Sequence, residues 1–264
     1  MIGDNMLNLA LIDSDSIYFR VACVLVDTKA DKFKVRNWKK DMRTSIDYTM
    51  RNIEQETMAD KMMVAIKGRG NFRNEIAADY KGTRKELHPK VKEALNYGHE
   101  YMCDKWEAVM ANDMEADDLV AIWAAEAREE EIDYYVVGID KDLLQIPGNH
   151  YNFVKKEHRS VDLDEAHLLL MTQALTGDNA DNIPGIKGIG PKKAEKILAG
   201  VPMERRWSRV KAAWRGHKAG NPDLSLRLLT MLTSFEELEV ARNQFKRQTP
   251  ISKPDVLARE EGED

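Results

Sequence analysis

The chain has 264 residues, of which 43% are hydrophobic, and its formal net charge is −5. This length allows one large domain or a domain with a smaller lobe, and no apolar run approaches the roughly 18 residues of a membrane span. Two cysteines without metal-ligand spacing, and an N-terminus without a secretion signal, predict a cytoplasmic protein that does not bind membranes.

The negative net charge does not exclude a nucleic-acid ligand, because charges of opposite sign are segregated. Basic residues dominate two blocks, residues 67–92 and 187–218, whereas acidic residues gather at 113–118 and 126–133. Basic surfaces that flank an acidic pocket suit a protein that binds phosphates and divalent cations.

The first half of the chain alternates between apolar strand patterns and helical patterns. In chain order we predict a strand at 7–12 that ends at Asp13, a helix at 38–58, a strand at 62–66, a polar and basic stretch to about 89, a helix at 90–103 and a strand at 107–110. Strands that alternate with helices predict a mainly parallel sheet.

The second half begins in the same way and then becomes helical. We predict an amphipathic helix at 115–130, a strand at 134–139, a turn at 147–149 and a helix at 165–175 that Asp164 could cap. Strand patterns then fade, so the predicted domains are an α/β catalytic part over 1–160 and a helical DNA-binding part over 161–250. Residues 251–264 are expected to form a disordered acidic tail.

Acidic residues follow the predicted strands or begin the predicted helices, where open α/β sheets bind ligands. They are Asp13, Glu115, Asp117, Asp118, Asp140, Asp142, Asp178 and Asp181. Together these carboxylates would repel one another unless cations lay among them, and all-oxygen ligands favour Mg²⁺ or Mn²⁺. Two such ions about 4 Å apart can activate water and stabilise the leaving oxygen in phosphodiester hydrolysis.

Residues 185–190, here called the glycine hairpin, read Gly-Ile-Lys-Gly-Ile-Gly. The glycine spacing is wrong for a dinucleotide loop, and no strand pattern precedes it. We interpret the segment as a helix-hairpin-helix turn whose backbone amides approach phosphate. The predicted DNA-binding residues here are Gly185, Lys187, Gly188, Gly190, Lys192, Lys193 and Lys196, with Ile186 and Ile189 anchoring the turn.

These motifs, together with Phe72-Arg73-Asn74-Glu75 and Tyr80-Lys81-Gly82-Thr83-Arg84, resemble the 5′-nuclease family over roughly residues 7–245. That family includes bacteriophage 5′→3′ exonucleases, the 5′-nuclease domain of bacterial DNA polymerase I and flap endonucleases. The resemblance implies a PIN-like α/β domain with a helical arch around 68–105, and a C-terminal helix-hairpin-helix (H3TH) lobe.

The resemblance also implies residue roles. The eight acidic residues named above would hold two Mg²⁺ ions, with Asp117 also counted as catalytic, and a K⁺ ion is expected at the glycine hairpin. Arg73, Lys81 and Arg84 would steer the scissile phosphate and neutralise its developing charge. Tyr80 would either stack on an unpaired base or lie in the core.

One position departs from the family pattern. The family has an Asp at the end of its second strand, and the corresponding residue here is Ile66. Either the enzyme works with weaker affinity for one metal, or one metal site is lost. If the missing ligand matters, Ile66→Asp should lower the Mg²⁺ concentration needed for cleavage.

Three functions follow from these observations. The leading one is a Mg²⁺-dependent 5′→3′ exonuclease and flap endonuclease, acting as a monomer in a bacterial cell or a phage-infected host. Its partners would be DNA with free 5′ ends, flaps or nicks, RNA–DNA hybrids, and a polymerase in trans. The alternatives are a structure-specific DNA-binding protein with an impaired metal centre, and a PIN-type ribonuclease, which would not account for the glycine hairpin.

Overall fold

The central element of the fold is a six-stranded sheet of order β5-β4-β1-β6-β7-β8, seen in a computed structural model that describes residues 7–217 and 220–246. Its strands are β1 (Asn8–Asp13), β4 (Lys61–Lys67), β5 (Val109–Ala111), β6 (Asp133–Val137), β7 (Gly148–Asn152) and β8 (Glu157–Val161). The neighbours from β5 to β7 pair in parallel, and β8 pairs antiparallel with β7. The predicted mainly parallel α/β sheet is confirmed.

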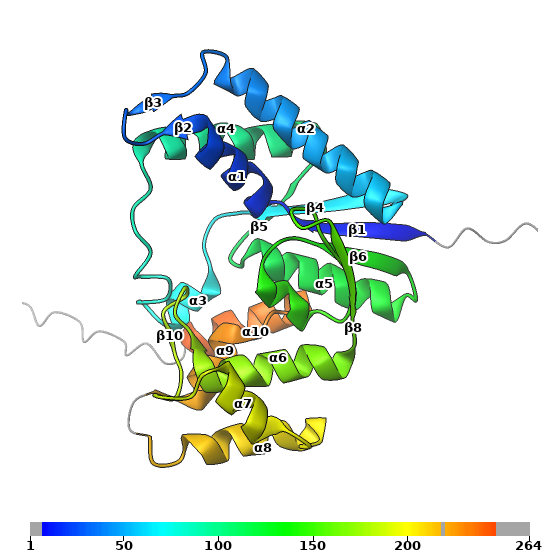
Figure 1. Ribbon diagram of the computed structural model, residues 1–264. Helices are drawn as coiled ribbons and strands as arrows, with labels where there is room; N and C mark the ends of the chain where they lie inside the picture. The colour runs from blue at the N-terminus through cyan, green and yellow to red at the C-terminus, as the bar shows by residue number, and fades with distance from the viewer. Residues whose placement is uncertain (1–6, 218–219, 247–264) are drawn as a thin grey trace, which may run out of the picture.

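Helices cover both faces of this sheet (Figure 1). One face carries α1 (Asp15–Leu25), α2 (Trp38–Thr57) and α4 (Pro89–Trp106), and the other carries α5 (Ala116–Glu129), with α10 (Phe235–Lys246) beyond α5 on the side away from the strands (Figure 1). Strand β1 shows the pattern that this arrangement requires, because Leu9 and Leu11 pack on the α5 side while Ala10 and Ile12 pack on the α1 side.

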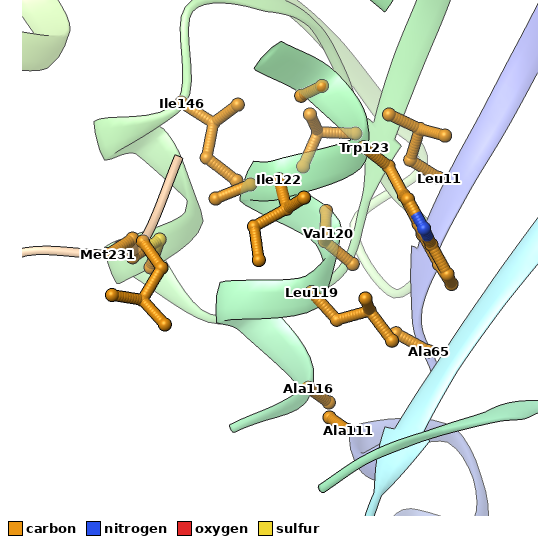
Figure 2. Packing of buried hydrophobic residues seen from close by; sticks show 14 of the residues in the cluster. Leu11, Ala65, Ala111, Ala116, Leu119, Val120, Ile122, Trp123, Ile146 and Met231 are labelled. Carbon is orange, nitrogen blue, oxygen red and sulfur yellow. The ribbon is translucent and has the colours of Figure 1, made fainter. Parts of the chain in front are cut away.

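Helix α5 lies between the sheet and the C-terminal helical part. Figure 2 shows Trp123 directed toward the strands beside Leu11, and Met231 on the other side of the helix. Asp118 Oδ2 accepts a hydrogen bond from Glu115 N (3.0 Å), which closes the first turn of α5. Because α5 is buried on both sides, its start is held firmly at the carboxyl edge of the sheet.

The remaining elements are short. They are β2 (Val26–Asp27) with β3 (Lys32–Phe33), α3 (Phe72–Ile76), the 3-10 helix η1 (Lys141–Gln145), α6 (Leu163–Thr176), β9 (Gly177–Asp178) with β10 (Ile183–Pro184), α7 (Pro191–Leu198), α8 (Met203–Trp214) and α9 (Pro222–Leu229). The last strand of the six-stranded sheet ends at Val161 and α6 begins two residues later; after this point the described residues are mostly helical, with β9 and β10 as the only strands. The division into two domains stays a prediction, since Met231, Leu232 and Leu238 share a buried cluster with the sheet.

Two local predictions were wrong. Residues 147–149 were predicted as a turn, but β7 begins at Gly148; its polar sequence lacks the apolar alternation that marks a strand. Asp162 rather than Asp164 caps α6, accepting a hydrogen bond from Glu165 N at 2.8 Å. Asp164 instead pairs with Arg206.

The arch segment, residues 68–105, contains two helices of very different length. Helix α3 is short, residues 78–83 form turns, residues 84–88 have no regular structure, and α4 packs against α1 and α2. Figure 1 shows the stretch before α4 running along one side of the molecule, from the neighbourhood of β10 to that of β2 and β3.

The acidic tail predicted at 251–264 lies outside the described residues. Within them, no helix combines the length and the apolar character needed to cross a membrane.

Candidate active site

The predicted metal-binding carboxylates lie at the carboxyl ends of the parallel strands. Asp13 is the last residue of β1, and Asp140 follows β6, the strand paired directly with β1. Glu115 is the N-cap residue of α5, which places Asp117 in the first helical turn. Parallel pairing of β1 and β6 therefore brings acidic groups from distant parts of the chain to one edge.

A pocket opens beside this edge and is lined by acidic residues from three segments. They are Glu115, Asp117, Asp142, Asp178 and Asp181. The structure thus gathers these five side chains around one cavity, with Asp13 and Asp140 adjoining them at the strand ends. Five of the eight predicted ligands therefore line the pocket, and Asp13 and Asp140 lie beside it.

The pocket is unfavourable for negative charge. Burial, followed by repulsion from Asp15, Asp140 and Glu115, raises the pKa of Asp13 to about 7. Burial and the neighbouring Asp118 and Glu115 carboxylates also raise the pKa of Asp117 well above its ordinary value. A divalent cation would relieve this repulsion, and the oxygen-rich lining suits Mg²⁺ or Mn²⁺.

Three basic side chains contact the pocket carboxylates. Lys81 Nζ is ion-paired with Glu115, Arg84 Nη2 lies 2.7 Å from Asp181 Oδ1, and Lys141 Nζ lies 2.9 Å from Asp178 Oδ2. In the described part of the chain, no three Asp, Glu, His or Cys side chains are arranged to hold a metal ion. Because the three basic side chains already contact carboxylate oxygens of the pocket, a metal ion would compete with them for the same oxygens.

Asp118 does not line the pocket. Its side chain is completely buried and receives two hydrogen bonds from the Arg73 guanidinium, at 2.5 and 2.8 Å. Its oxygens also accept from the backbone amides of Glu115 and Leu232. The expectation that Asp118 is a metal ligand is therefore corrected. Both of its oxygens accept hydrogen bonds within the protein, so its role is structural.

Arg73 is the partner in that pair and is only 2% exposed. Besides Asp118 it donates to the carbonyl oxygens of Leu228 and Thr230, at 2.8 and 2.9 Å. The guanidinium joins α3 to α5 and to the end of α9. The expectation that Arg73 steers the scissile phosphate is therefore corrected, because its donors are used within the protein.

The ring of Tyr80 is not placed to stack on an unpaired base, which was the first of its two interpretations. It is 5% exposed, packs with Met171 and Leu175 of α6, and its hydroxyl oxygen lies 3.1 Å from both Glu115 Oε2 and Asp181 Oδ2, within hydrogen-bond distance of either. A ring buried in this way cannot stack on a base. The structure supports the alternative of a core tyrosine.

The glycine hairpin presents exposed lysines around an open turn. Lys187, Lys192 and Lys196 are exposed, and Lys193 Nζ donates to Gly188 O at 2.7 Å. Gly188 has a φ of +82°, and a Cβ atom at Gly188 or Gly190 would meet no atom within 4 Å. The surface there is open enough for a phosphate group to reach the backbone.

At Gly185 a side chain is excluded by close backbone packing rather than by a phosphate site. A Cβ atom at this residue would lie 2.1 Å from Thr176 C, so the residue allows β9 and β10 to approach closely. Its predicted DNA contact has no support from this geometry. Ile186 is buried and Ile189 is partly buried in the same core, as predicted for residues that anchor the turn.

Ile66 supplies no ligand to the pocket. It is completely buried and packs with Ile12 and Ile17 on the face of the sheet that carries α1. A nearby carboxylate that the sequence analysis did not single out is Asp15, whose Oδ1 accepts hydrogen bonds from Lys67 N and the Tyr18 hydroxyl group. Its position two residues after Asp13 was the available sequence signal.

Two other contributors were missed. Lys141 lies inside the Asp140-Lys141-Asp142 motif, and its position between two of the proposed ligands was the available sequence signal. Gln173 donates to Asp142 Oδ1 at 2.5 Å and contacts Gln145 at 2.7 Å. No sequence pattern indicates Gln173, because its role depends on α6 packing beside η1.

Residues 8–172 match the family model described as 5′-3′ exonuclease, N-terminal resolvase-like domain. DNA polymerase I of Bacillus caldotenax is 29% identical over 209 residues, which is 72% of this chain and 23% of that polymerase. DNA polymerase I of Rhizobium leguminosarum is 34% identical over 143 residues, 48% of this chain and 14% of that protein. The chain thus spans about a quarter or less of the length of these relatives.

Solved structures of similar fold come from bacteriophage T5. The T5 D15 flap endonuclease variant D155K, in a pseudo-enzyme-product complex with DNA and metal ions, has a TM-score of 0.62 and 19% identity, with 91% of this chain and 97% of that chain covered. T5 5′-exonuclease with bound zinc has a TM-score of 0.62 and 18% identity, with 91% and 98% covered. These similarities establish a shared fold.

Proposed function

This chain belongs to the family of 5′-3′ exonuclease N-terminal resolvase-like domains, and we propose that it is a divalent-metal-dependent nuclease that cuts DNA at free 5′ ends and at flap junctions. The observation that supports this most directly is the pocket of carboxylates at the carboxyl edge of the sheet, where burial and mutual repulsion disfavour negative charge. Such a site favours the binding of cations, and exposed lysines for a phosphate backbone lie nearby.

The proposed metal ligands are Asp13, Glu115, Asp117, Asp140, Asp142, Asp178 and Asp181. Bound Mg²⁺ or Mn²⁺ would supply an activated water and stabilise the leaving oxygen, giving a 5′-phosphate product. Asp118 is omitted from this set because Arg73 and two backbone amides use its oxygens.

Lys81 and Arg84 are the residues proposed to position the scissile phosphate. Lys81 is partly exposed and Arg84 is exposed, and both approach the pocket from the turn that follows α3. Once metal ions neutralise Glu115 and Asp181, both cations become available to phosphate oxygens. Arg73 supports them indirectly by fixing α3 against α5.

The glycine hairpin is proposed to hold the duplex part of the substrate. Its open backbone at Gly188 and Gly190 and the lysines at 187, 192 and 196 are suited to phosphates rather than to base edges. Binding should therefore weaken strongly with salt and depend little on sequence. RNA–DNA hybrids, a polymerase partner, a monomeric state, a cytoplasmic location in a bacterial or phage-infected cell and a K⁺ ion at the glycine hairpin stay predictions.

The experiment is cleavage of end-labelled nicked, flapped and blunt duplexes across a Mg²⁺ titration. We expect cleavage of the strand that carries the free 5′ end or flap. This cleavage should require metal and should be lost in Asp140→Asn. RNA–DNA hybrids tested in parallel would define the substrate range.

A second candidate is supported by Ile66, which leaves β4 without a carboxylate in the pocket. In that case the chain would be a structure-specific DNA-binding protein with an impaired metal centre. Flapped DNA that binds but is not cut in either Mg²⁺ or Mn²⁺ would establish this function and exclude the nuclease.

A further inference from the structure

The carboxyl end of β4 has an acidic neighbour that comes from another segment of the chain. Ile66, near the end of this strand, is buried among apolar residues and offers no ligand. Asp15, the first residue of α1, lies at the same strand end, because its Oδ1 accepts a hydrogen bond from Lys67 N at 3.0 Å. Lys67 directly follows Ile66 and is the last residue of β4. A carboxylate is therefore present at the end of β4 although the strand itself contributes none.

The turn between β1 and α1 fixes the position of Asp15. Ser14 N and Ser14 Oγ both donate to Ala65 O, at 3.0 and 2.7 Å. One turn further along α1, the Tyr18 hydroxyl group donates to Asp15 Oδ1 at 2.8 Å. These hydrogen bonds hold the start of α1 against β4, so the fold itself determines where the Asp15 carboxylate lies.

Asp15 is also a direct neighbour of Asp13, the proposed ligand at the end of β1. Asp13 Oδ1 accepts a hydrogen bond from Asp15 N at 3.2 Å. Two carboxylates this close repel each other unless a cation lies near them. In the described part of the chain, no lysine, arginine or histidine side-chain nitrogen lies within 4.0 Å of the Asp15 carboxylate. Its charge is therefore available to an external cation.

One oxygen of Asp15 remains available for such a cation. Both hydrogen bonds that the carboxylate accepts use Oδ1, and within the described residues Oδ2 accepts none. The residue is partly exposed, whereas Asp118 is completely buried and has both oxygens bonded within the protein. Asp15 thus combines a fixed position with a free anionic oxygen, a combination that Asp118 lacks.

We propose that Asp15 is a further metal-binding residue of this chain, and that its Oδ2 supplies, beside Asp13, the carboxylate oxygen that Ile66 does not supply. This inference rests on the proposed function. The ligand is a divalent cation that prefers oxygen, such as Mg²⁺ or Mn²⁺, held directly or through one of its water molecules. The replacement of an acidic residue by Ile66 would then leave the metal centre complete, which favours the nuclease over the binding protein.

The test compares Asp15→Asn with the matched control Asp41→Asn. Asparagine removes the charge of Asp15 but keeps an oxygen that can accept from Lys67 N and from the Tyr18 hydroxyl group. Asp41 is also partly exposed and in the first turn of a helix, α2, but it does not line the pocket. Electron paramagnetic resonance of free Mn²⁺ measures metal binding in the absence of DNA. Thermal unfolding with and without Mn²⁺ verifies folding and reports binding independently.

We expect Asp15→Asn to bind Mn²⁺ about tenfold more weakly than the wild type, the loss typical of a residue that supports a metal directly or through a bound ligand. Its melting temperature should also rise less when Mn²⁺ is added. Asp41→Asn should match the wild type in both measurements. If Asp15→Asn does not fold, Asp15→Ser provides the same comparison, because serine is uncharged and is well tolerated at a helix start.

Mn²⁺ binding by the folded Asp15 variant that equals wild-type binding would overturn the inference and leave Asp15 with the structural role of anchoring β4. An equal loss in Asp41→Asn would overturn it too, because the loss would then reflect net charge. If the wild type binds Mn²⁺ and cuts flapped DNA while either result is obtained, only the role of Asp15 is wrong. A wild type that neither binds Mn²⁺ nor cuts DNA would remove the proposed function as well.

Discussion

Lys141 Nζ lies 2.9 Å from Asp178 Oδ2, so a lysine that is 66% exposed is paired with a carboxylate that is only 6% exposed. Although burial acts to raise it, the hydrogen bonds from Lys141 and from Ala180 N lower the pKa of Asp178. The lysine thus acts as a counter-ion at a place where the proposed function needs a metal ion.

Lys141→Met should strengthen Mg²⁺ binding, because the metal would no longer compete with an ammonium group for Asp178. The effect should be about two- to fivefold, the size expected of a partly exposed ion pair. The measurement is the Mg²⁺ dependence of the melting temperature. Lys155→Met is the control, since Lys155 is equally exposed and its carboxylate neighbour, Glu157, is 4.0 Å away. Weaker Mg²⁺ binding in Lys141→Met would show that the lysine supports the site instead.

Asp118→Asn should destabilise the fold by about 3 to 5 kcal/mol, because it leaves the buried Arg73 charge without its partner. Urea denaturation measures this loss of unfolding free energy. The control is Lys92→Gln, which breaks the exposed pair with Glu86 and should change stability little. If Asp118→Asn instead left stability intact and weakened Mg²⁺ binding, Asp118 would be a metal ligand after all.

The stabilising effect of Mg²⁺ should increase with pH. The pKa of Asp13 is raised from 3.8 to about 7 in the folded protein, so the folded state without metal holds a proton that the unfolded chain has lost. Stability of the metal-free protein should therefore fall as pH rises toward 7, whereas Mg²⁺ favours the charged carboxylate. The melting temperature should rise more with saturating Mg²⁺ at about pH 8 than at about pH 6. Asp13→Asn should reduce this difference without abolishing it, because the pKa of Asp117 is raised as well. A larger Mg²⁺ effect at the lower pH would contradict the prediction.

Ile66→Asp should destabilise the protein and should not improve metal binding. The side chain is completely buried among Ile12, Ile17 and their neighbours, on the face of the sheet that carries α1. A carboxyl group there has no polar partner, so a loss of about 3 kcal/mol or more is expected. Ile66→Val keeps the apolar contact and should cost about 1 kcal/mol. A stable Ile66→Asp protein that needs less Mg²⁺ for cleavage would restore the original expectation from the sequence.

Lys187→Gln/Lys192→Gln should weaken binding to duplex DNA of any sequence by a similar factor. Both side chains are exposed beside the open backbone of the glycine hairpin. The salt slope of binding should become smaller by about 1.8, corresponding to two phosphate contacts. A change confined to one sequence would indicate base contacts rather than phosphate contacts.

The elements that the sequence predicted well are those with strong local patterns. The apolar runs predicted as strands at 7–12 and 134–139 correspond to strands β1 and β6, and the amphipathic pattern after Glu115 is helix α5. Strand β7 was missed because its residues are mostly polar and its pairing with β6 is a tertiary contact. Hydrophobic periodicity cannot reveal a strand whose stability comes from a neighbour.

The sequence by itself determined which residue types meet at the strand ends, because parallel strands place their carboxyl ends at one edge whatever the details of packing. Only the tertiary structure decided which of these residues are free to act. Arg73 and Asp118 belong to motifs that look functional, yet α3, α5 and the end of α9 bury them together. Burial and hydrogen-bond partners depend on segments up to 157 residues apart, and local patterns carry no information about that distance.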